Sequence, residues 1–134
     1  MNAPTPRAVL SGVQITCILP VVDLERARRF YAGKLGLEPV GARPDGKYVF
    51  RSGGTEIALF PKPGGTKADH TAVSFQVKDV VAAVRALQAR GVVFAEYDLP
   101  GLKTVDHVCV LGSEKAAWFN DPEGNILCLH EDIA

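Results

Sequence analysis

The stretch WFNDPEGNILCLH, residues 118–130, decides the fold of this chain. Its centre, Asp-Pro-Glu-Gly, predicts a tight turn, because three of its residues suit one. Asp121 can accept hydrogen bonds from its own turn, Pro122 fixes φ, and Gly124 accepts a positive φ. The runs on either side are typical of strands, so the stretch predicts a β-hairpin.

The strand that leaves this turn, predicted over 125–131, has two chemically different faces. Alternate side chains of a strand point to opposite sides, so Leu127 and Leu129 share one face. The opposite face carries Ile126, Cys128 and His130. The leucine face suits a protein core, which leaves the role of the second face to be explained by the rest of the chain.

Composition excludes several classes of protein. The 134 residues are 47% hydrophobic, enough for one compact domain with a core. Lys and Arg number 15 and Asp and Glu number 15, so there is no basic excess and we expect no nucleic-acid partner. Since no apolar run approaches the roughly 18 residues that span a bilayer, we expect no membrane partner.

The three cysteines, Cys17, Cys109 and Cys128, lack the paired spacing of a disulfide framework or a zinc finger. The beginning, MNAPTPRAVL, lacks the charged-then-apolar plan of a signal peptide. We therefore expect a cytoplasmic protein with reduced thiols.

The first half of the chain predicts a strand, a helix and three more strands. A strand over 13–20 precedes Asp23, which can cap a helix, and Gly36 is a typical helix stop. The later strands are predicted over 37–42, 46–52 and 55–61.

The second half repeats this order. A strand over 70–77 precedes Asp79 as a helix cap and Gly91 as a helix stop. The later strands are predicted over 92–97, 106–111, 115–120 and 125–131.

An insertion distinguishes the two halves. Asp23 and Asp79 lie near the beginnings of the two halves, and Gly54 and Gly124 lie near their ends. More residues separate the two glycines than the two aspartates, so the second half is longer than the first. The additional residues of the second half fall around YDLPGLKTVDHV, and insertions and ligand contacts both favour loops. Whether residues 99–107 form a lid is left open.

Three motifs carry a resemblance to a known family: DLERARRFYAGKLGLEPV at 23–40, AVSFQVKDVVAAVRAL at 72–87 and WFNDPEGNILCLHE at 118–131. They resemble the vicinal oxygen chelate superfamily, which contains glyoxalase I, fosfomycin-resistance enzymes, extradiol dioxygenases and bleomycin-binding resistance proteins. The resemblance covers roughly residues 13–131.

The resemblance implies an α+β fold in which two tandem βαβββ modules form a curled, cup-shaped mixed sheet with helices on the outer face. The parts would be a flexible N-terminal tail (1–12), module one (13–61), a connector (62–69) and module two (70–131). Family members commonly dimerise around the cup, so we expect a homodimer.

The resemblance also implies where a metal would bind, since metal-dependent members take His, Gln or Glu ligands from the first and last strands of each module. The corresponding residues are Thr16, Ala58, Ala72 and Cys128. Two alanines offer no lone pair, and a site needs about three protein ligands. We therefore expect no metal and no cofactor, and a divalent metal on remodelled ligands stays as an alternative.

Four polar residues lie two positions away from those slots and share their faces: Gln14, Glu56, His70 and His130. The two histidines are displaced in opposite directions, by about 13 Å in total, so one ion cannot bind both. Gln14, Glu56 and His70 are the set that remains for a displaced metal site.

Strand parity assigns a mixed composition to the face inside the predicted cup, and an apolar lining with sparse polar groups is typical of a ligand pocket. The predicted ligand-binding residues are Gln14, Thr16, Glu56, Ala58, Phe60, His70, Ala72, Ser74, Trp118, Cys128 and His130. A face open to water would have a similar mixture. Whether Trp118 or Phe119 points inward is left open, because the neighbouring turn can include a bulge.

A cup without a metal-ligand set favours a protein that binds a small organic molecule, of antibiotic or aromatic metabolite type. The zero net charge disfavours a strongly cationic ligand. The alternative is a lyase, isomerase or dioxygenase of lactoylglutathione-lyase type, metal-independent or with remodelled ligands, in which Glu56 or His70 is the general base. An interaction module without a ligand is a further alternative.

Overall fold

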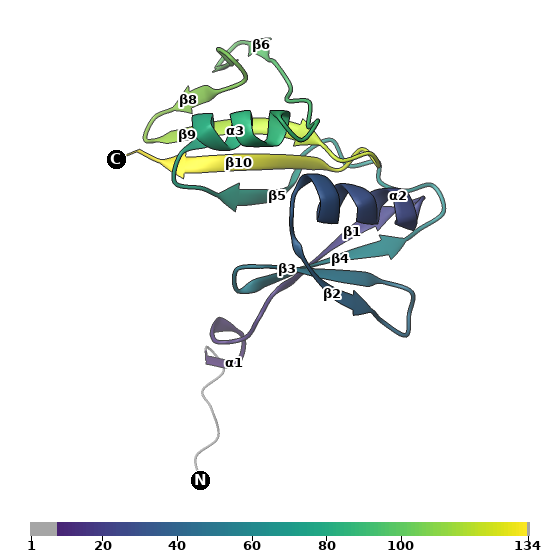
Figure 1. Ribbon diagram of the computed structural model, residues 1–134. Coiled ribbons are helices and arrows are strands. Elements are labelled where there is room, and N and C mark those ends of the chain that lie inside the picture. The colour runs from purple at the N-terminus through teal and green to yellow at the C-terminus, as the bar shows by residue number, and fades with distance from the viewer. Residues whose placement is uncertain (1–7, 134) are drawn as a thin grey trace.

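The computed structural model describes residues 8–133, and its elements repeat one order in two halves (Figure 1). A short helix, α1 (Ala8–Ser11), comes first. Module one then contains β1 (Thr16–Val21), α2 (Leu24–Arg29), the π-helical turn η1 (Phe30–Lys34), β2 (Glu38–Ala42), β3 (Tyr48–Ser52) and β4 (Thr55–Pro61). Module two contains β5 (Thr71–Gln76), α3 (Val80–Gln88), β6 (Asp98–Leu99), β7 (Leu102–Lys103), β8 (Cys109–Leu111), β9 (Glu114–Asn120) and β10 (Ile126–Asp132).

Each module forms its own four-stranded mixed sheet, with the order β1-β4-β3-β2 in module one and β5-β10-β9-β8 in module two. The first strand of each module pairs in parallel with the last one, β1 with β4 and β5 with β10, and the remaining pairs are antiparallel. The predicted α+β fold of two βαβββ modules is confirmed, with the strands in two open sheets rather than one.

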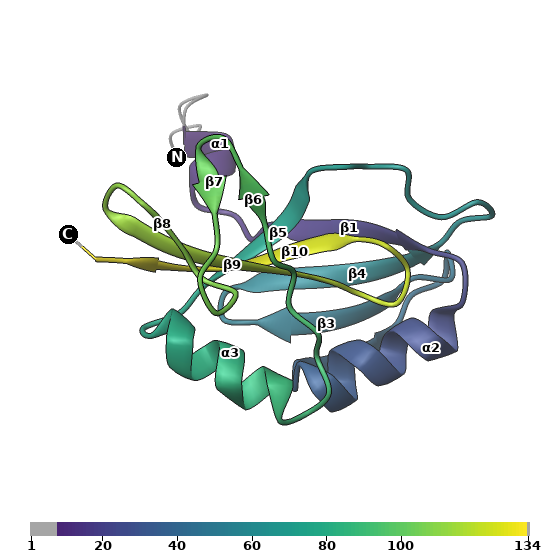
Figure 2. The ribbon, with the colours of Figure 1, turned by 90° about the horizontal axis from the view of Figure 1, so that it is seen from above.

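Helices α2 and α3 lie one after the other on the same side of the two sheets (Figure 2). The core fills the space between helices and sheets, and the two modules share it. Phe30 of module one lies 6.3 Å, between ring centroids, from Phe119 of module two, which lies 5.1 Å from Phe94. The face of each sheet turned away from this core is called the cup face below.

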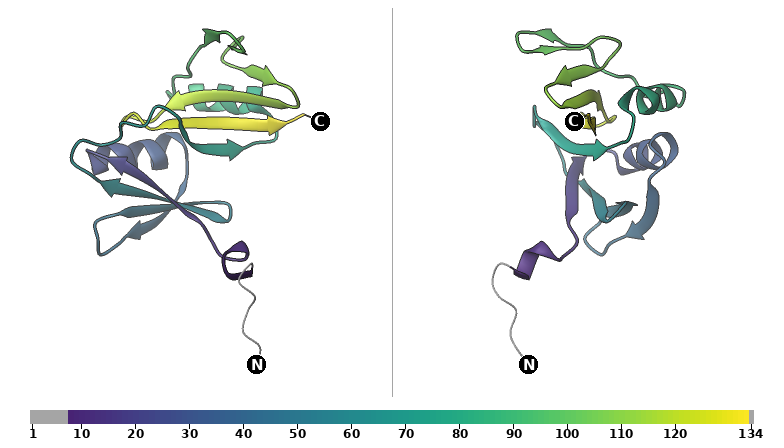
Figure 3. Two further views of the ribbon diagram at one scale, coloured as in Figure 1. Left: turned by 180° about the vertical axis from the view of Figure 1, so that it is seen from behind. Right: turned by 90° about the vertical axis from the view of Figure 1, so that its left-hand side faces the viewer.

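Two segments project on the side away from the helices, α1 at one end of the molecule and the β6–β7 hairpin at the other (Figure 3). Within residues 8–133, no helix combines the length and the apolar character that crossing a bilayer requires.

Aspartate side chains begin both helices, as predicted. Asp23 accepts a hydrogen bond from the backbone N–H of Arg26, and Asp79 accepts one from the backbone N–H of Ala82. These bonds satisfy N–H groups that a helix start leaves without a partner. Gly36, with φ of 71°, follows the end of the first helix, where the left-handed conformation favours glycine.

The start of the first strand differs from the prediction. We predicted a strand over 13–20, but β1 begins at Thr16, and Ile15 before it is 66% exposed. Pairing with β4 starts at Thr16 and Glu56, so the residues before it lie beyond the sheet. Of the predicted tail, residues 8–11 form α1, and residues 1–7 lie outside the described residues.

The insertion accounts for two further corrections in module two. The strand predicted over 92–97 is wrong, because only Phe94 forms an isolated bridge, to Phe119. The chain then leaves the sheet to form the β6–β7 hairpin. The strand predicted over 106–111 begins only at Cys109, since residues 105–108 form a turn.

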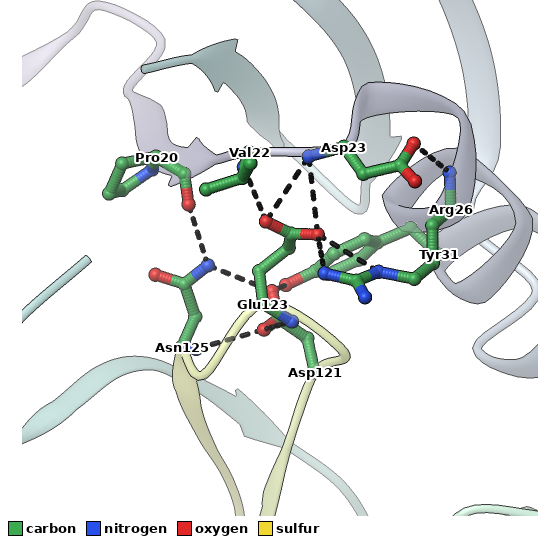
Figure 4. A network of polar contacts seen from close by, with 8 residues as sticks. All are labelled: Pro20, Val22, Asp23, Arg26, Tyr31, Asp121, Glu123 and Asn125. Atoms are coloured by element: carbon green, nitrogen blue, oxygen red, sulfur yellow. Dashed lines mark hydrogen bonds and ion pairs between the residues drawn. The ribbon is translucent and has the colours of Figure 1, made fainter. Parts of the chain in front are cut away.

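The Asp-Pro-Glu-Gly-Asn turn between β9 and β10 reaches across to module one and holds the start of α2 (Figure 4). The Glu123 carboxylate accepts hydrogen bonds from the backbone N–H groups of Val22 and Asp23 and from the guanidinium of Arg26. Its side chain is only 1% exposed. Unpaired N–H groups make a helix start favourable for negative charge, so a carboxylate of module two completes the helix start of module one.

Asp121 and Asn125 fix the other side of this turn. The Asp121 carboxylate accepts a hydrogen bond of 2.6 Å from the phenol of Tyr31 and bonds of 2.8 Å from the backbone N–H groups of Glu123 and Asn125. The Asn125 amide donates to the carbonyl of Pro20 at 3.0 Å. Burial, reinforced by the neighbouring Asp121 carboxylate, raises the pKa of Tyr31 far above its usual value, so its phenol remains a donor.

The E123Q variant should lower the free energy of unfolding by about 2 to 3 kcal/mol, measured by urea denaturation. The amide loses the ion pair with Arg26 and one acceptor oxygen, while the backbone N–H groups of Val22 and Asp23 stay in place. The matched control is E25Q, whose exposed ion pair with Arg28 should contribute less than about 0.5 kcal/mol. Equal effects of the two variants would contradict the assigned role of Glu123.

The stabilisation by Glu123 should also depend on pH. Burial alone would raise the pKa of Glu123, but the hydrogen bonds from Val22, Arg26 and Asp23 outweigh it and hold the pKa below the ordinary value of 4.5. A carboxyl whose pKa is lowered on folding stabilises the protein above its unfolded-state pKa, and this contribution is lost as pH falls through the folded-state pKa. The difference in unfolding free energy between wild type and E123Q should therefore be constant above about pH 5.5 and shrink below pH 4.5. A constant difference down to pH 3 would contradict this assignment.

Candidate functional site

The cup face of module one contains a cavity of about 390 Å³. The strand register builds its floor, because Thr16 lies opposite Glu56 and Ala58 lies opposite both Ile18 and Val49. Paired residues of neighbouring strands share a face of the sheet, so these side chains converge. The overhanging wall comes from the turn between β2 and β3 and consists of Arg43, Pro44, Asp45 and Lys47.

Acidic and basic side chains line this cavity in equal number. The Glu56 carboxylate accepts a hydrogen bond of 3.4 Å from the Thr16 hydroxyl and lies 3.8 Å from the Arg51 guanidinium. Lys47 pairs with Asp45 at 3.1 Å. Among residues 8–133, Arg43 has no ion pair, so its guanidinium is available to a bound molecule.

Three of the predicted site residues, Thr16, Glu56 and Ala58, therefore lie together in one cavity. The contribution of the β2–β3 turn was missed, since a turn between short strands carries no periodic signal that assigns it to a face. Arg43 and Lys47 flank the turn signal Pro44-Asp45-Gly46, which was the only hint of this wall.

Other predicted residues of module one and the connector lie outside this cavity. Gln14 is exposed and precedes β1, and Phe60 shares the cup face at 37% exposure but lies beyond the cavity wall. His70 is exposed in the connector before β5. Gln14, Glu56 and His70 thus do not meet as the displaced ligand set that the sequence left open: within residues 8–133, no three His, Cys, Asp or Glu side chains gather to hold a metal ion.

The cup face of module two brings together a second group of predicted residues. Cys128 lies opposite Ser74 on one side and Trp118 on the other. The Ser74 hydroxyl lies 2.5 Å from Nδ1 of His130, which is two residues after Cys128 on β10. These residues all come from module two, whereas every wall of the 390 Å³ cavity comes from module one.

Trp118 rather than Phe119 points to the cup face. The Trp118 indole N–H donates to the hydroxyl of Thr71 at 3.2 Å, and its ring meets that of Tyr97 edge-on at 5.6 Å. Phe119 is 1% exposed in the core. The pairing of β9 with β10 is regular from the turn onward, so β9 keeps a simple alternation; the register shift lies in the pairing of β10 with β5, where Ala72 is the additional residue.

The register of β5 corrects the estimated distance between the two histidines. Cys128 pairs with Ser74 rather than with Ala72, and His130 pairs with Gln76. His70 lies six residues before Gln76, about 20 Å along an extended strand, so the predicted distance of about 13 Å was too short. One metal ion therefore cannot bind both histidines.

Ala72 and Ser74 instead line a larger space of about 590 Å³ beside the edge of β5. Its other wall includes Cys17 and Ile57 of module one. The space lies where the two open sheet edges, β1 and β5, approach each other.

The residues at the four implied metal positions do not fit a divalent ion. Ala58 and Ala72 end in methyl groups, and the Thr16 hydroxyl and the Cys128 thiol lie on different sheets. Burial raises the pKa of Cys128, and the hydrogen bond with Ser74 only partly offsets it, so the thiol stays protonated at neutral pH. Its sulfur donates to the carbonyl of Leu129 at 3.3 Å.

The chain matches the model of the Glyoxalase/Bleomycin resistance protein/Dioxygenase superfamily over residues 13–129. It belongs to this superfamily. The motifs and the duplicated fold of this glyoxalase-superfamily protein agree with that match, so the predicted family is confirmed.

One curated relative of this glyoxalase-superfamily protein is the trivalent organoarsenical cleaving enzyme of Bacillus sp. (strain MD1), which is 26% identical over 110 residues. The alignment covers 80% of this chain but 65% of that enzyme, so the chain spans less than two thirds of its relative.

Solved structures share the fold. A superfamily member from Sphaerobacter thermophilus DSM 20745 has a TM-score of 0.71 and 24% identity, covering 92% of this chain and 100% of that one. An antibiotic binding protein from Streptomyces sp. CB03234 has a TM-score of 0.66 and 24% identity, covering 92% and 98%. The genomically encoded fosfomycin resistance protein of Listeria monocytogenes has a TM-score of 0.66 and 20% identity, covering 90% and 91%.

Proposed function

We propose that this protein binds a small organic molecule on its cup face without a metal ion. The observation that carries the proposal is the 390 Å³ cavity, in which Ala58 and Val49 provide an apolar floor and a few charged groups surround it. Binding sites for small molecules combine an apolar lining with sparse, well-placed polar groups, and their volumes begin at about 300 Å³.

The charges of the cavity favour a neutral or mixed-charge aromatic ligand. Two cations, Arg43 and Lys47, face two anions, Asp45 and Glu56, so the lining has no net charge. A strongly cationic molecule would need an acidic excess. The free guanidinium of Arg43 suits a carboxylate or a phenolate at the edge of the ligand, because guanidinium forms strong, charge-assisted hydrogen bonds to such groups.

The similarity to the antibiotic binding protein supports binding as the function class, and the similarity to the organoarsenical cleaving enzyme supports a catalytic alternative. That alternative is a metal-independent lyase or isomerase with Glu56 as general base. It is favoured by the Glu56 carboxylate, whose side chain is 17% exposed at the cavity. His70 is less suited to this role, since it lies outside the cavity.

A second copy of the chain would complete the site. The cavity of module one and the Ser74, Trp118, Cys128 and His130 group of module two are two half-sites on separate sheets. In a symmetric dimer, module one of one chain can face module two of its partner, which gives two equal sites. The exposed apolar residues of the arm before β1 support this arrangement: Val9, Leu10, Val13 and Ile15.

Ligand binding should respond to the size of residue 58. The A58L variant places three more carbons in the cavity and should weaken an aromatic ligand by at least about tenfold. The assay is isothermal titration with 4-aminobenzoate, 2-naphthoate, fosfomycin and bleomycin, followed also by Trp118 fluorescence. The matched control is A32L, at an exposed alanine of η1, and circular dichroism checks that both variants fold. Binding that is equally strong in both variants would contradict the cavity as the site.

Elemental analysis separates the binding function from the metal alternative. Protein purified without chelators and incubated with excess Mn, Fe(II), Ni, Co or Zn should contain far less than one ion per chain. One ion per chain would contradict the metal-free proposal. Turnover of a ligand that is abolished in E56Q, with its binding retained, would replace binding by catalysis as the function.

In solution the protein should be a homodimer with twice the chain mass of 14.3 kDa. The L10E variant should weaken dimerisation by at least about tenfold, because Leu10 is 77% exposed on the projecting helix α1. V93E is the matched control, since Val93 is 83% exposed on the segment after α3. Analytical ultracentrifugation measures the dimerisation of the wild type and of both variants. A monomeric wild type would contradict the proposal that a second chain completes the site.

A further inference from the structure

A second cavity, of about 360 Å³, lies between α3 and the turn 105–108, on the helix side of module two. It shares no residue with the cavity on the cup face. The turn belongs to the insertion that distinguishes module two from module one, so nothing in module one corresponds to this cavity.

The turn beside this cavity is a tight two-residue turn without glycine. Val105 and Val108 exchange backbone hydrogen bonds of 2.8 and 3.1 Å, and the two residues between them have positive φ, 50° at Asp106 and 72° at His107. This is the geometry of a two-residue hairpin turn that favours glycine at its second position. Histidine adopts the left-handed region more readily than most residues other than glycine, so His107 is accommodated there.

His107 contacts Glu96 and Phe94. Its buried Nδ1 lies 3.0 Å from Oε1 of Glu96, without an aligned hydrogen bond. Its ring packs against Phe94, with 6.4 Å between centroids. The turn is therefore held in a fixed position at the cavity.

One cation and one anion line the cavity without neutralising each other. Arg85, in the last turn of α3, and Asp106, in the turn, both form part of its wall. Within residues 8–133, neither side chain has an ion pair. Gln88 adds an amide one helical turn after Arg85.

Apart from His107, the rest of the wall is apolar and consists of Val81, Val84, Val105 and Val108. Val84 is 3% exposed and forms the floor of the cavity, whereas Val105 is 69% exposed at its rim. These side chains match the groups of a ligand with a carboxylate, an ammonium group and a short hydrocarbon chain.

We propose that this cavity is a binding site for an aliphatic α-amino acid. The ligand carboxylate pairs with Arg85 and Gln88, its ammonium group pairs with Asp106, and its side chain packs on the four valines. The volume is at the small end of the range for ligand pockets, which suits a molecule of this size. This site is separate from the cup and would serve as an effector site or a second ligand site.

Titration of full-length protein with L-leucine, followed by two-dimensional NMR, tests the proposal. Amide signals of residues 105–108 and of the end of α3 should shift in a saturable way. R85Q and D106N should each weaken binding by about tenfold, because each removes one charge-assisted pair. The matched control R29Q, at an exposed arginine of α2, should change the affinity less than about twofold.

Two truncated ligands test the charge assignment. 4-Methylpentanoate lacks the ammonium group and isoamylamine lacks the carboxylate, so each should bind about tenfold more weakly than L-leucine. Binding of either compound as tightly as L-leucine would overturn the proposal. The absence of saturable shifts at tens of millimolar L-leucine, or full affinity in R85Q or D106N, would also overturn it.

Discussion

The buried carboxylate of Glu123 at the start of α2 is the interaction on which the arrangement of the two modules depends. It satisfies two backbone N–H groups and one guanidinium that belong to the other half of the chain. Asp121 and Asn125 of the same turn hold Tyr31 and Pro20. A single turn thus replaces the solvent that the helix start would otherwise bind, and it fixes module two against module one.

The position of this turn decides which faces of the sheets remain available. Because it joins the modules on the helix side, aromatic residues of both modules meet in one shared core, and the cup faces are turned away from it. On the cup face of module one, Ala58 leaves space beside Glu56 and Thr16, and the β2–β3 turn adds Arg43 and Lys47 above that space. The proposed binding of an organic molecule rests on the volume of this cavity, its hydrogen-bonding groups and its equal numbers of acidic and basic side chains. The proposed dimer follows from the same geometry, since a half-site of one module needs a surface opposite it.

Much of the fold could be predicted from local signals. Asp23 and Asp79 mark helix starts, and the turn at 121–124 is marked by its own residues, because the chemistry of caps and turns is decided by close neighbours in the chain. Alternation along β4 placed Glu56 and Ala58 on one face for the same reason. The strand predicted over 92–97 failed because the insertion after it draws the chain away from the sheet.

The sequence by itself determined the repeated order of strands and helices, the turn at 121–124 and the absence of ligand side chains at Ala58 and Ala72. Only the tertiary structure decided that Glu123 binds a helix of the other module, that Ser74 rather than Ala72 faces Cys128, and that Arg43 overhangs the cavity. The reason is physical: caps, turns and strand alternation depend on neighbours in the chain. Strand register and contacts between modules depend on which surfaces pack together, and one additional residue at the start of β5 shifts its register against β10 without a local signal.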